Sequence, residues 1–219
     1  MKFNIHILII AFAIIFLMGG HYFIKSTAYD FTSDEAGQQL RIRTFPLTLG
    51  TFEERCVDSF GKQILCRQLS DIQAGDILIT KSSFTLFYRH GHVGLVVDAD
   101  EGLVIEALGY GNYSRLEPLE DWNKYPTVKV LRLKNGDENL INSMVEMTIA
   151  EFLDIPYSIF ARGNDLSRTH CSALIWKIFY EKGINLNSSN RPFVTPRSIA
   201  NSPYLEVIQS YGFNSQLKW

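Results

Sequence analysis

Residues 91–98 read Gly-His-Val-Gly-Leu-Val-Val-Asp, and residues 102–108 read Gly-Leu-Val-Ile-Glu-Ala-Leu. Both runs are rich in apolar, β-forming side chains, and a polar turn separates them, so they predict two consecutive strands. Each run carries one polar side chain of interest. His92 begins the first strand, and Glu106 lies between apolar neighbours in the second. A carboxylate in such a run requires a polar partner, because its burial alone is costly.

The rest of the chain predicts further strands and two or three helices. Asp137 is placed to cap a helix that ends before Pro156, since the residue before a proline is pushed out of the helical region. Residues 171–182 predict a second helix, which Gly183 ends. We therefore expect an α+β fold in which a small antiparallel sheet or barrel packs against these helices. The other expected elements are strands at 76–80, 127–133 and 204–208 and a short helix that opens at 195–196.

Length and charge limit the classes of protein that the chain can represent. It has 219 residues, of which 46% are apolar and 20% charged, as is typical of one globular domain. The net charge is −2, and it becomes −4 without residues 1–28, which hold two lysines and no acid. This mildly acidic domain lacks the clustered basic face that nucleic-acid binding requires, so we expect no nucleic-acid partner.

The N-terminus predicts export from the cytoplasm. Residues 7–18 are apolar without a break, which suits the core of a secretory signal, and the apolar character continues to residue 24. Residues 1–28 are therefore either a cleaved signal peptide or a membrane anchor, and residues 5–24 would contact the membrane if they are retained. Residues 29–68 are expected to be a lead-in of loops and short strands, and residues 69–219 the main domain.

The chain has three cysteines, an odd number. Cys56 and Cys66 are close enough in sequence to form a small disulfide loop in an oxidising compartment. Cys171 is then left over, and an unpaired thiol in an exported protein is a candidate reactive group. It opens the predicted helix 171–182, where the helix dipole and free N–H groups favour the thiolate.

A thiolate nucleophile needs a base and a group that orients the base. His92 is the candidate base, and Glu106 is the candidate orienting group. Backbone N–H groups at the start of the helix of Cys171 can hold the oxyanion of an acyl-transfer reaction. His90 and His92 would share one face of a strand without a third or fourth ligand, so we expect no metal site. The chain also lacks the glycine-rich loops that bind nucleotide phosphates.

Six short segments occur in a characteristic order along the chain. They are Gly75-Asp76-Ile77, residues 91–98, Val104-Ile105-Glu106-Ala107, Ile155-Pro156-Tyr157, residues 170–175 (His-Cys-Ser-Ala-Leu-Ile) and residues 195–200 (Thr-Pro-Arg-Ser-Ile-Ala).

Together these segments resemble the permuted papain-like amidases of the YaeF/YiiX type, which are related to the NlpC cell-wall hydrolases and, more distantly, to lecithin–retinol acyltransferase. In this group the histidine strand precedes the cysteine helix. The resemblance implies a circularly permuted papain-like (NlpC-like) fold in which a β-barrel packs against the nucleophile helix. It also implies that Cys171 is the nucleophile, His92 the base and Glu106 the third member, without a cofactor. Tyr157 and His170 are the candidate substrate or oxyanion contacts.

Three functions follow from this set of residues. The first is a cysteine amidase or peptidase outside the cytoplasm, acting on peptides or N-acyl amides from the cell wall or from lipids. The second is a lipid acyltransferase, thioesterase or esterase with the same three residues. The third is a non-catalytic binding module, which is suggested by His170 and Ala173, since the family often has tyrosine and glutamate at these positions.

Overall fold

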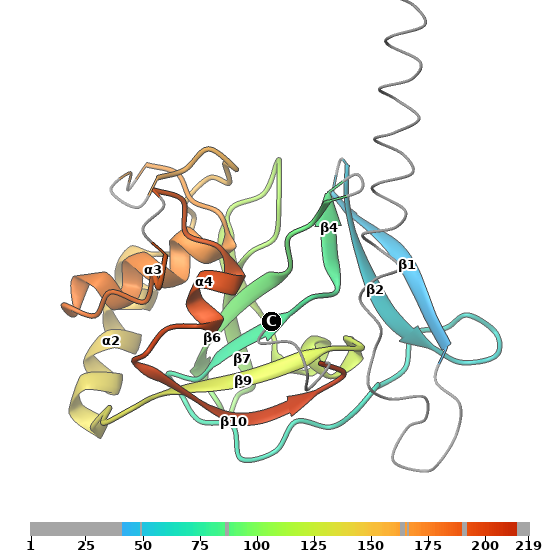
Figure 1. Cartoon of the computed structure of the whole chain (residues 1–219), viewed down its shortest axis with the longest axis horizontal. Coiled ribbons are helices and arrows are strands. Elements are labelled where there is room, and N and C mark those ends of the chain that lie inside the picture. The colour runs from blue at the N-terminus through green and yellow to red at the C-terminus, as the bar shows by residue number, and fades with distance from the viewer. Residues whose placement is uncertain are drawn as a thin grey trace, which may run out of the picture.

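Two antiparallel sheets form the strand framework of the protein (Figure 1). The computed structural model describes residues 41–48, 50–85, 88–162, 165, 167–189 and 192–213. The smaller sheet has the order β1-β2-β4-β5, and the larger has the order β10-β9-β3-β6-β7-β8. The strands are β1 (Arg41–Thr48), β2 (Thr51–Val57), β3 (Ile77–Thr80), β4 (Ser83–Thr85), β5 (Tyr88–Arg89), β6 (His92–Asp98), β7 (Leu103–Ala107), β8 (Ser114–Pro118), β9 (Val128–Leu133) and β10 (Leu205–Tyr211).

The α+β class and the expected strands of the larger sheet are confirmed, whereas the barrel is not found. Within the described residues both sheets are open, because β10 and β8 form opposite edges of the larger sheet and do not pair with each other. The hairpin of β6 and β7 lies next to the β8 edge, with Leu95 opposite Ile105 and Val96 opposite Val104. This pairing brings the His92 strand and the Glu106 strand side by side.

The helices begin where their capping residues predict. The 3₁₀ helix η1 spans Leu119–Lys124, and the α-helices are α2 (Glu138–Glu151), α3 (Cys171–Glu181) and α4 (Pro196–Ala200). The Asp137 carboxylate accepts a hydrogen bond from the Leu140 N–H at 2.8 Å, which confirms it as the cap of α2. Thr195 and Ser198 form a capping box at the start of α4.

The larger sheet is buried on both faces, and each face has its own core. Because side chains alternate along a strand, Val93 and Leu95 face the helices, while Val96 faces the opposite way. The helix-side core includes Leu174 and Ile178 of α3. On the other face, Val96 and Val104 pack with Trp122, Tyr125 and the two cysteines 56 and 66.

The described part of the region expected to be a lead-in of loops and short strands contains the hairpin of β1 and β2. β1 and β2 have eight and seven residues, and β2 also pairs with β4. The sequence of β2 has no clear strand pattern, because the strand buries three consecutive charged residues, Glu53, Glu54 and Arg55. Arg55 is paired with Glu53, and Arg89 of β5 is paired with Glu54, so these charges are compensated within the strand framework.

Candidate active site

Cys171 is the first residue of α3, and His170 caps that helix. The His170 Nδ1 accepts a hydrogen bond from the Ala173 N–H at 3.3 Å, and the His170 carbonyl accepts one from the Leu174 N–H. The Cys171 side chain is buried at the end of the helix-side core. The expected position of the thiol at the start of a helix is therefore what the structure has. The cap was not expected, since histidine is not among the preferred capping residues.

His92 and Glu106 lie in contact on the neighbouring strands β6 and β7. The His92 Nε2 and the Glu106 Oε2 are 2.6 Å apart, and both side chains are almost completely buried. Gly94, two residues after His92 in β6, has no side chain to push Glu106 and Trp122 away. A Cβ atom at Gly94 would lie 3.2 Å from the Glu106 Cγ and 3.0 Å from the Trp122 Cζ2. The glycine therefore permits the close approach of these groups.

Trp122 of η1 is the second partner of Glu106, and no sequence pattern predicted it. Its indole N–H donates to the Glu106 Oε1 at 2.6 Å. Its ring also stacks on the His92 ring, with the centroids 5.7 Å apart and the planes inclined by 16°. Both carboxylate oxygens of Glu106 thus have a partner, as a buried carboxylate requires. The residues that flank Trp122 in the sequence form no recognisable motif. The one available signal was the need of Glu106 for a buried hydrogen-bond donor.

The electrostatics of the site favour a charged Cys171–His92 pair. Burial alone would lower the pKa of His92, but hydrogen bonds to Cys171 and Glu106 and the charges of both outweigh it and raise the pKa to about 10. Burial alone would raise the pKa of the Cys171 thiol, yet hydrogen bonds from His170 and His92 bring it well below its ordinary range. Since Nε2 of His92 contacts Glu106, Nδ1 is the nitrogen that faces the sulfur. Both shifts favour the thiolate of Cys171 together with the imidazolium of His92.

Tyr157 and His90 lie close enough to Cys171 to interact with its charge. Tyr157 is half-buried, and its backbone forms a parallel β-bridge with Thr169. Burial raises the pKa of Tyr157, and the negative charge of Cys171 raises it further. His90 donates from Nδ1 to the Gly91 carbonyl and accepts at Nε2 from the Thr85 hydroxyl, at 2.6 and 2.9 Å. These two bonds hold the half-buried ring of His90. Burial lowers the pKa of His90.

A disulfide joins Cys56 of β2 to Cys66, and Cys171 is the free cysteine of the described chain. Among those same residues, no group of three His, Cys, Asp or Glu side chains is arranged to hold a metal ion. No helix of the described part is long and apolar enough to cross a membrane. The expected signal or anchor at 1–28, and the membrane contact at 5–24, lie outside the described residues.

Comparison with known proteins gives three likenesses. The family model of the permuted papain-like amidases, YaeF/YiiX, C92 family, matches residues 71–209. The uncharacterized protein YycO of Bacillus subtilis is 28% identical over 154 residues, which is 66% of this chain and 58% of YycO. The chain thus spans less than two thirds of the length of that relative.

The third likeness is a crystal structure, that of the metalloprotein YiiX from Escherichia coli O157:H7. It is 19% identical, with a TM-score of 0.50, and the match covers 63% of this chain and 96% of YiiX. At this identity the likeness concerns the fold alone. The family match covers most of the domain, including the strand of His92 and the helix of Cys171. The chain therefore belongs to the permuted papain-like amidase family of the YaeF/YiiX type.

Proposed function

We propose that the protein is a cysteine hydrolase that cleaves an amide bond outside the cytoplasm through a thioester intermediate. The observation that carries the proposal is the buried chain of contacts from Cys171 through His92 to Glu106. Its charges favour a thiolate beside an imidazolium, which is the form of a cysteine nucleophile that reacts at neutral pH. A non-catalytic binding module would not require this arrangement.

In the acylation step, the Cys171 sulfur forms a bond to the substrate carbonyl carbon, and the electron pair of the C=O bond moves to oxygen. When the C–N bond breaks, the imidazolium of His92 gives its proton to the leaving amine. Neutral His92 then takes a proton from a water molecule, whose oxygen attacks the thioester carbon. The carboxylic acid leaves, and the thiolate and imidazolium are restored. Glu106 keeps the ring of His92 in place throughout.

The oxyanion requires donors at the start of α3. The N–H groups of Ala173 and Leu174 are used by His170, so the preceding N–H groups of Cys171 and Ser172 are the ones we assign to the oxyanion. His170 acts on the sulfur through the hydrogen bond that lowers the thiol pKa. Tyr157, which borders the thiol, is the substrate contact in this proposal.

The substrate class that we propose is a peptide or an N-acyl amide from the cell wall or from lipid. Export is supported by the apolar N-terminal run and by the Cys56–Cys66 disulfide, which is stable in an oxidising compartment. The second candidate, transfer or hydrolysis of a lipid acyl group, is supported by two side chains that follow Tyr157. Ile159 and Phe160 are 59% and 75% exposed, and such side chains suit an apolar acyl chain.

A substrate panel separates these activities. Purified protein is incubated with muropeptides, N-acyl amides, and short-chain and lipid esters, and the products are identified by mass spectrometry. The proposal predicts amide cleavage that is lost in Cys171→Ala and reduced about tenfold or more in Glu106→Gln, which keeps the shape of Glu106 but not its charge. Turnover of esters alone would favour the second candidate. Amide cleavage that persists in Cys171→Ala would contradict the cysteine mechanism.

A further inference from the structure

The position of Trp122 depends on a segment that lies outside the matched family region. Its indole reaches Glu106 and covers His92, so any rotation or shift of η1 would change both contacts. A 3₁₀ helix of six residues has little stability of its own. Other segments must therefore hold η1 in place. They can be identified from the contacts that the backbone carbonyl groups of η1 make.

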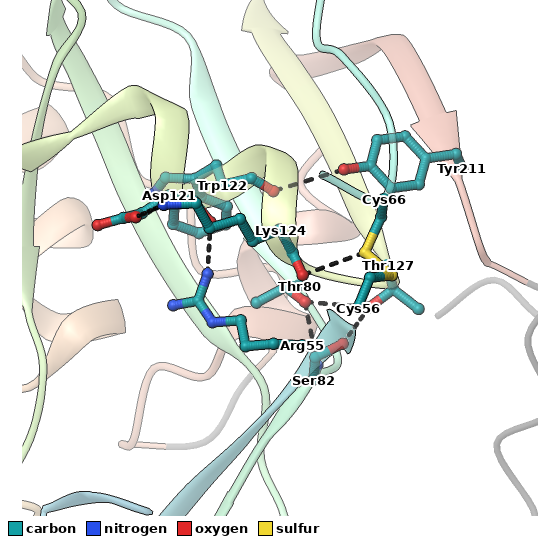
Figure 2. Close-up of a disulfide and its surroundings, with 10 residues drawn as sticks. All are labelled: Arg55, Cys56, Cys66, Thr80, Ser82, Asp121, Trp122, Lys124, Thr127 and Tyr211. Atoms are coloured by element: carbon teal, nitrogen blue, oxygen red, sulfur yellow. Dashed lines mark hydrogen bonds and ion pairs between the residues drawn. A yellow bond between two sulfur atoms is a disulfide. The ribbon is translucent and has the colours of Figure 1, made fainter. Parts of the chain in front are cut away.

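One side of η1 is held by the chain that leads out of the disulfide. The N–H groups of Cys66 and Arg67 both donate to the Asn123 carbonyl, at 2.7 and 3.3 Å. The Leu69 N–H donates to the Asn123 side-chain oxygen at 2.8 Å. The disulfide sulfur of Cys66 itself lies 3.1 Å from the Lys124 carbonyl oxygen (Figure 2).

The other side of η1 is held from β2 and β10. The Arg55 guanidinium donates to the Asp121 carbonyl, and Figure 2 shows it directed at η1 from the residue that precedes Cys56. Arg55 is itself fixed by both oxygens of Glu53 at 2.9 Å. The Tyr211 hydroxyl donates to the Trp122 carbonyl at 3.4 Å. Each of the four consecutive carbonyl groups of residues 121–124 in η1 thus contacts a group from outside the helix.

The disulfide covalently joins the two main anchors of η1. Arg55 is adjacent to Cys56, and the donors at 66–69 begin at Cys66, so one covalent bond fixes their separation. Both cysteines are buried in the same core as Trp122. Arg55 and the donors at 66–69 precede residue 71, where the family match begins.

We propose that the Cys56–Cys66 disulfide is a positioning element of the active site, which acts by holding η1 and thereby the indole of Trp122 against Glu106 and His92. The inference rests on the proposed function of Cys171. Without the disulfide, the anchors separate more freely, and Trp122 no longer fixes the carboxylate of Glu106. The imidazolium of His92 then loses stabilisation, and the pKa of the Cys171 thiol rises.

A double-mutant cycle on the full chain tests the route of this effect. The rate of alkylation of Cys171 by iodoacetamide is measured against pH in wild type, Trp122→Phe, Cys56→Ala/Cys66→Ala and the triple variant. Cys171 is the reactive free thiol in each, so its signal is unambiguous. We expect the midpoint to rise by about one pH unit in Trp122→Phe, which loses a hydrogen bond to a charged group. The cysteine pair variant should show a smaller rise, and the triple variant should match Trp122→Phe.

Two further variants separate positioning from general stability. Asp137→Ala removes the cap of α2, away from η1, and should lower Tm without moving the midpoint. Asn123→Ala keeps the disulfide but removes the acceptor of Leu69, and it should raise the midpoint even if the cysteine variants do not fold. The inference is overturned if the cysteine pair and Asn123→Ala variants keep the wild-type midpoint, or if their shifts add to that of Trp122→Phe. An ordinary-thiol profile in wild type would instead contradict the proposed function itself.

Discussion

At the scale of single residues, the pKa of the Cys171 thiol results from a competition between burial and charge. A buried thiol is expected to stay protonated, because the interior disfavours the thiolate. Here two histidines on different elements, His92 and His170, both direct hydrogen bonds to the sulfur. Glu106 supplies the negative charge that keeps His92 protonated while it does so. The thiol is thus activated by partners that the long-range fold brings together.

Gly94 allows Glu106 and Trp122 to approach β6 closely, although it takes no part in the chemistry. In Gly94→Ala, the added Cβ would lie 2.6 Å from the Val104 Cγ1 and close to Trp122 and Glu106, so these side chains must move. We expect a loss of about 1–3 kcal/mol in the free energy of unfolding. We also expect the alkylation midpoint of Cys171 to rise. Urea unfolding and alkylation at several pH values measure the two effects, and a destabilised variant with an unchanged midpoint would contradict the role assigned to Gly94.

At the scale of elements, the start of α3 has two functions that share one residue. His170 caps the helix through Nδ1 and hydrogen-bonds to the sulfur of Cys171. Because Nδ1 accepts from the Ala173 N–H, the proton of neutral His170 is on Nε2, the nitrogen that remains for the sulfur. The cap therefore fixes the tautomer that donates to the thiolate.

Two substitutions separate the functions of His170. Asparagine is a preferred capping residue, so His170→Asn should keep the stability of α3 but lose the hydrogen bond to the sulfur. His170→Ala should lose both, at an additional cost of about 1 kcal/mol. Both variants should raise the alkylation midpoint by a similar amount, and only the alanine variant should lower Tm markedly. A wild-type midpoint in His170→Asn would show that the histidine acts on Cys171 only as a cap.

The sequence predicted elements whose signals are local, and it missed those whose causes are distant. The strand of His92, the helix of Cys171 and the Asp137 cap follow from side-chain patterns within a few residues. The sequence predicted only loops and short strands around β2, because the buried charges Glu53–Arg55 are compensated by partners that only the fold supplies. Trp122 was missed because a short 3₁₀ helix has no periodic pattern, and its bond to Glu106 spans sixteen residues.

At the scale of the whole molecule, buried ion pairs help to hold the smaller sheet together. Arg89 of β5 contacts both oxygens of Glu54 on β2, at 2.7 and 2.8 Å, and also donates to the Lys81 carbonyl. The Arg89 and Glu54 side chains are both largely buried, so water cannot take the place of either one. The pair therefore specifies how β2 and β5 lie relative to each other, on the side of the molecule that holds η1.

Removal of one partner should be more harmful than removal of both. Arg89→Met leaves the Glu54 carboxylate buried without this partner, and we expect a loss of about 3 kcal/mol in the free energy of unfolding. The double variant Arg89→Met/Glu54→Leu should recover most of that loss, because an apolar pair needs no compensation. Urea unfolding of the three proteins measures the difference. Equal losses in the single and double variants would contradict the view that burial of an uncompensated charge is the cause.

In the proposed mechanism, Cys171 is a thiolate paired with the imidazolium of His92. The measurement that tests it most directly is the rate of iodoacetamide alkylation of Cys171 across the pH range, with Cys171→Ala as the blank. As pH rises, the thiolate forms when pH passes the lowered pKa of Cys171, whereas His92 keeps its proton until pH approaches about 10. We expect alkylation to be already close to its maximal rate at neutral pH. A midpoint at the ordinary thiol value of about 8.5 would contradict it.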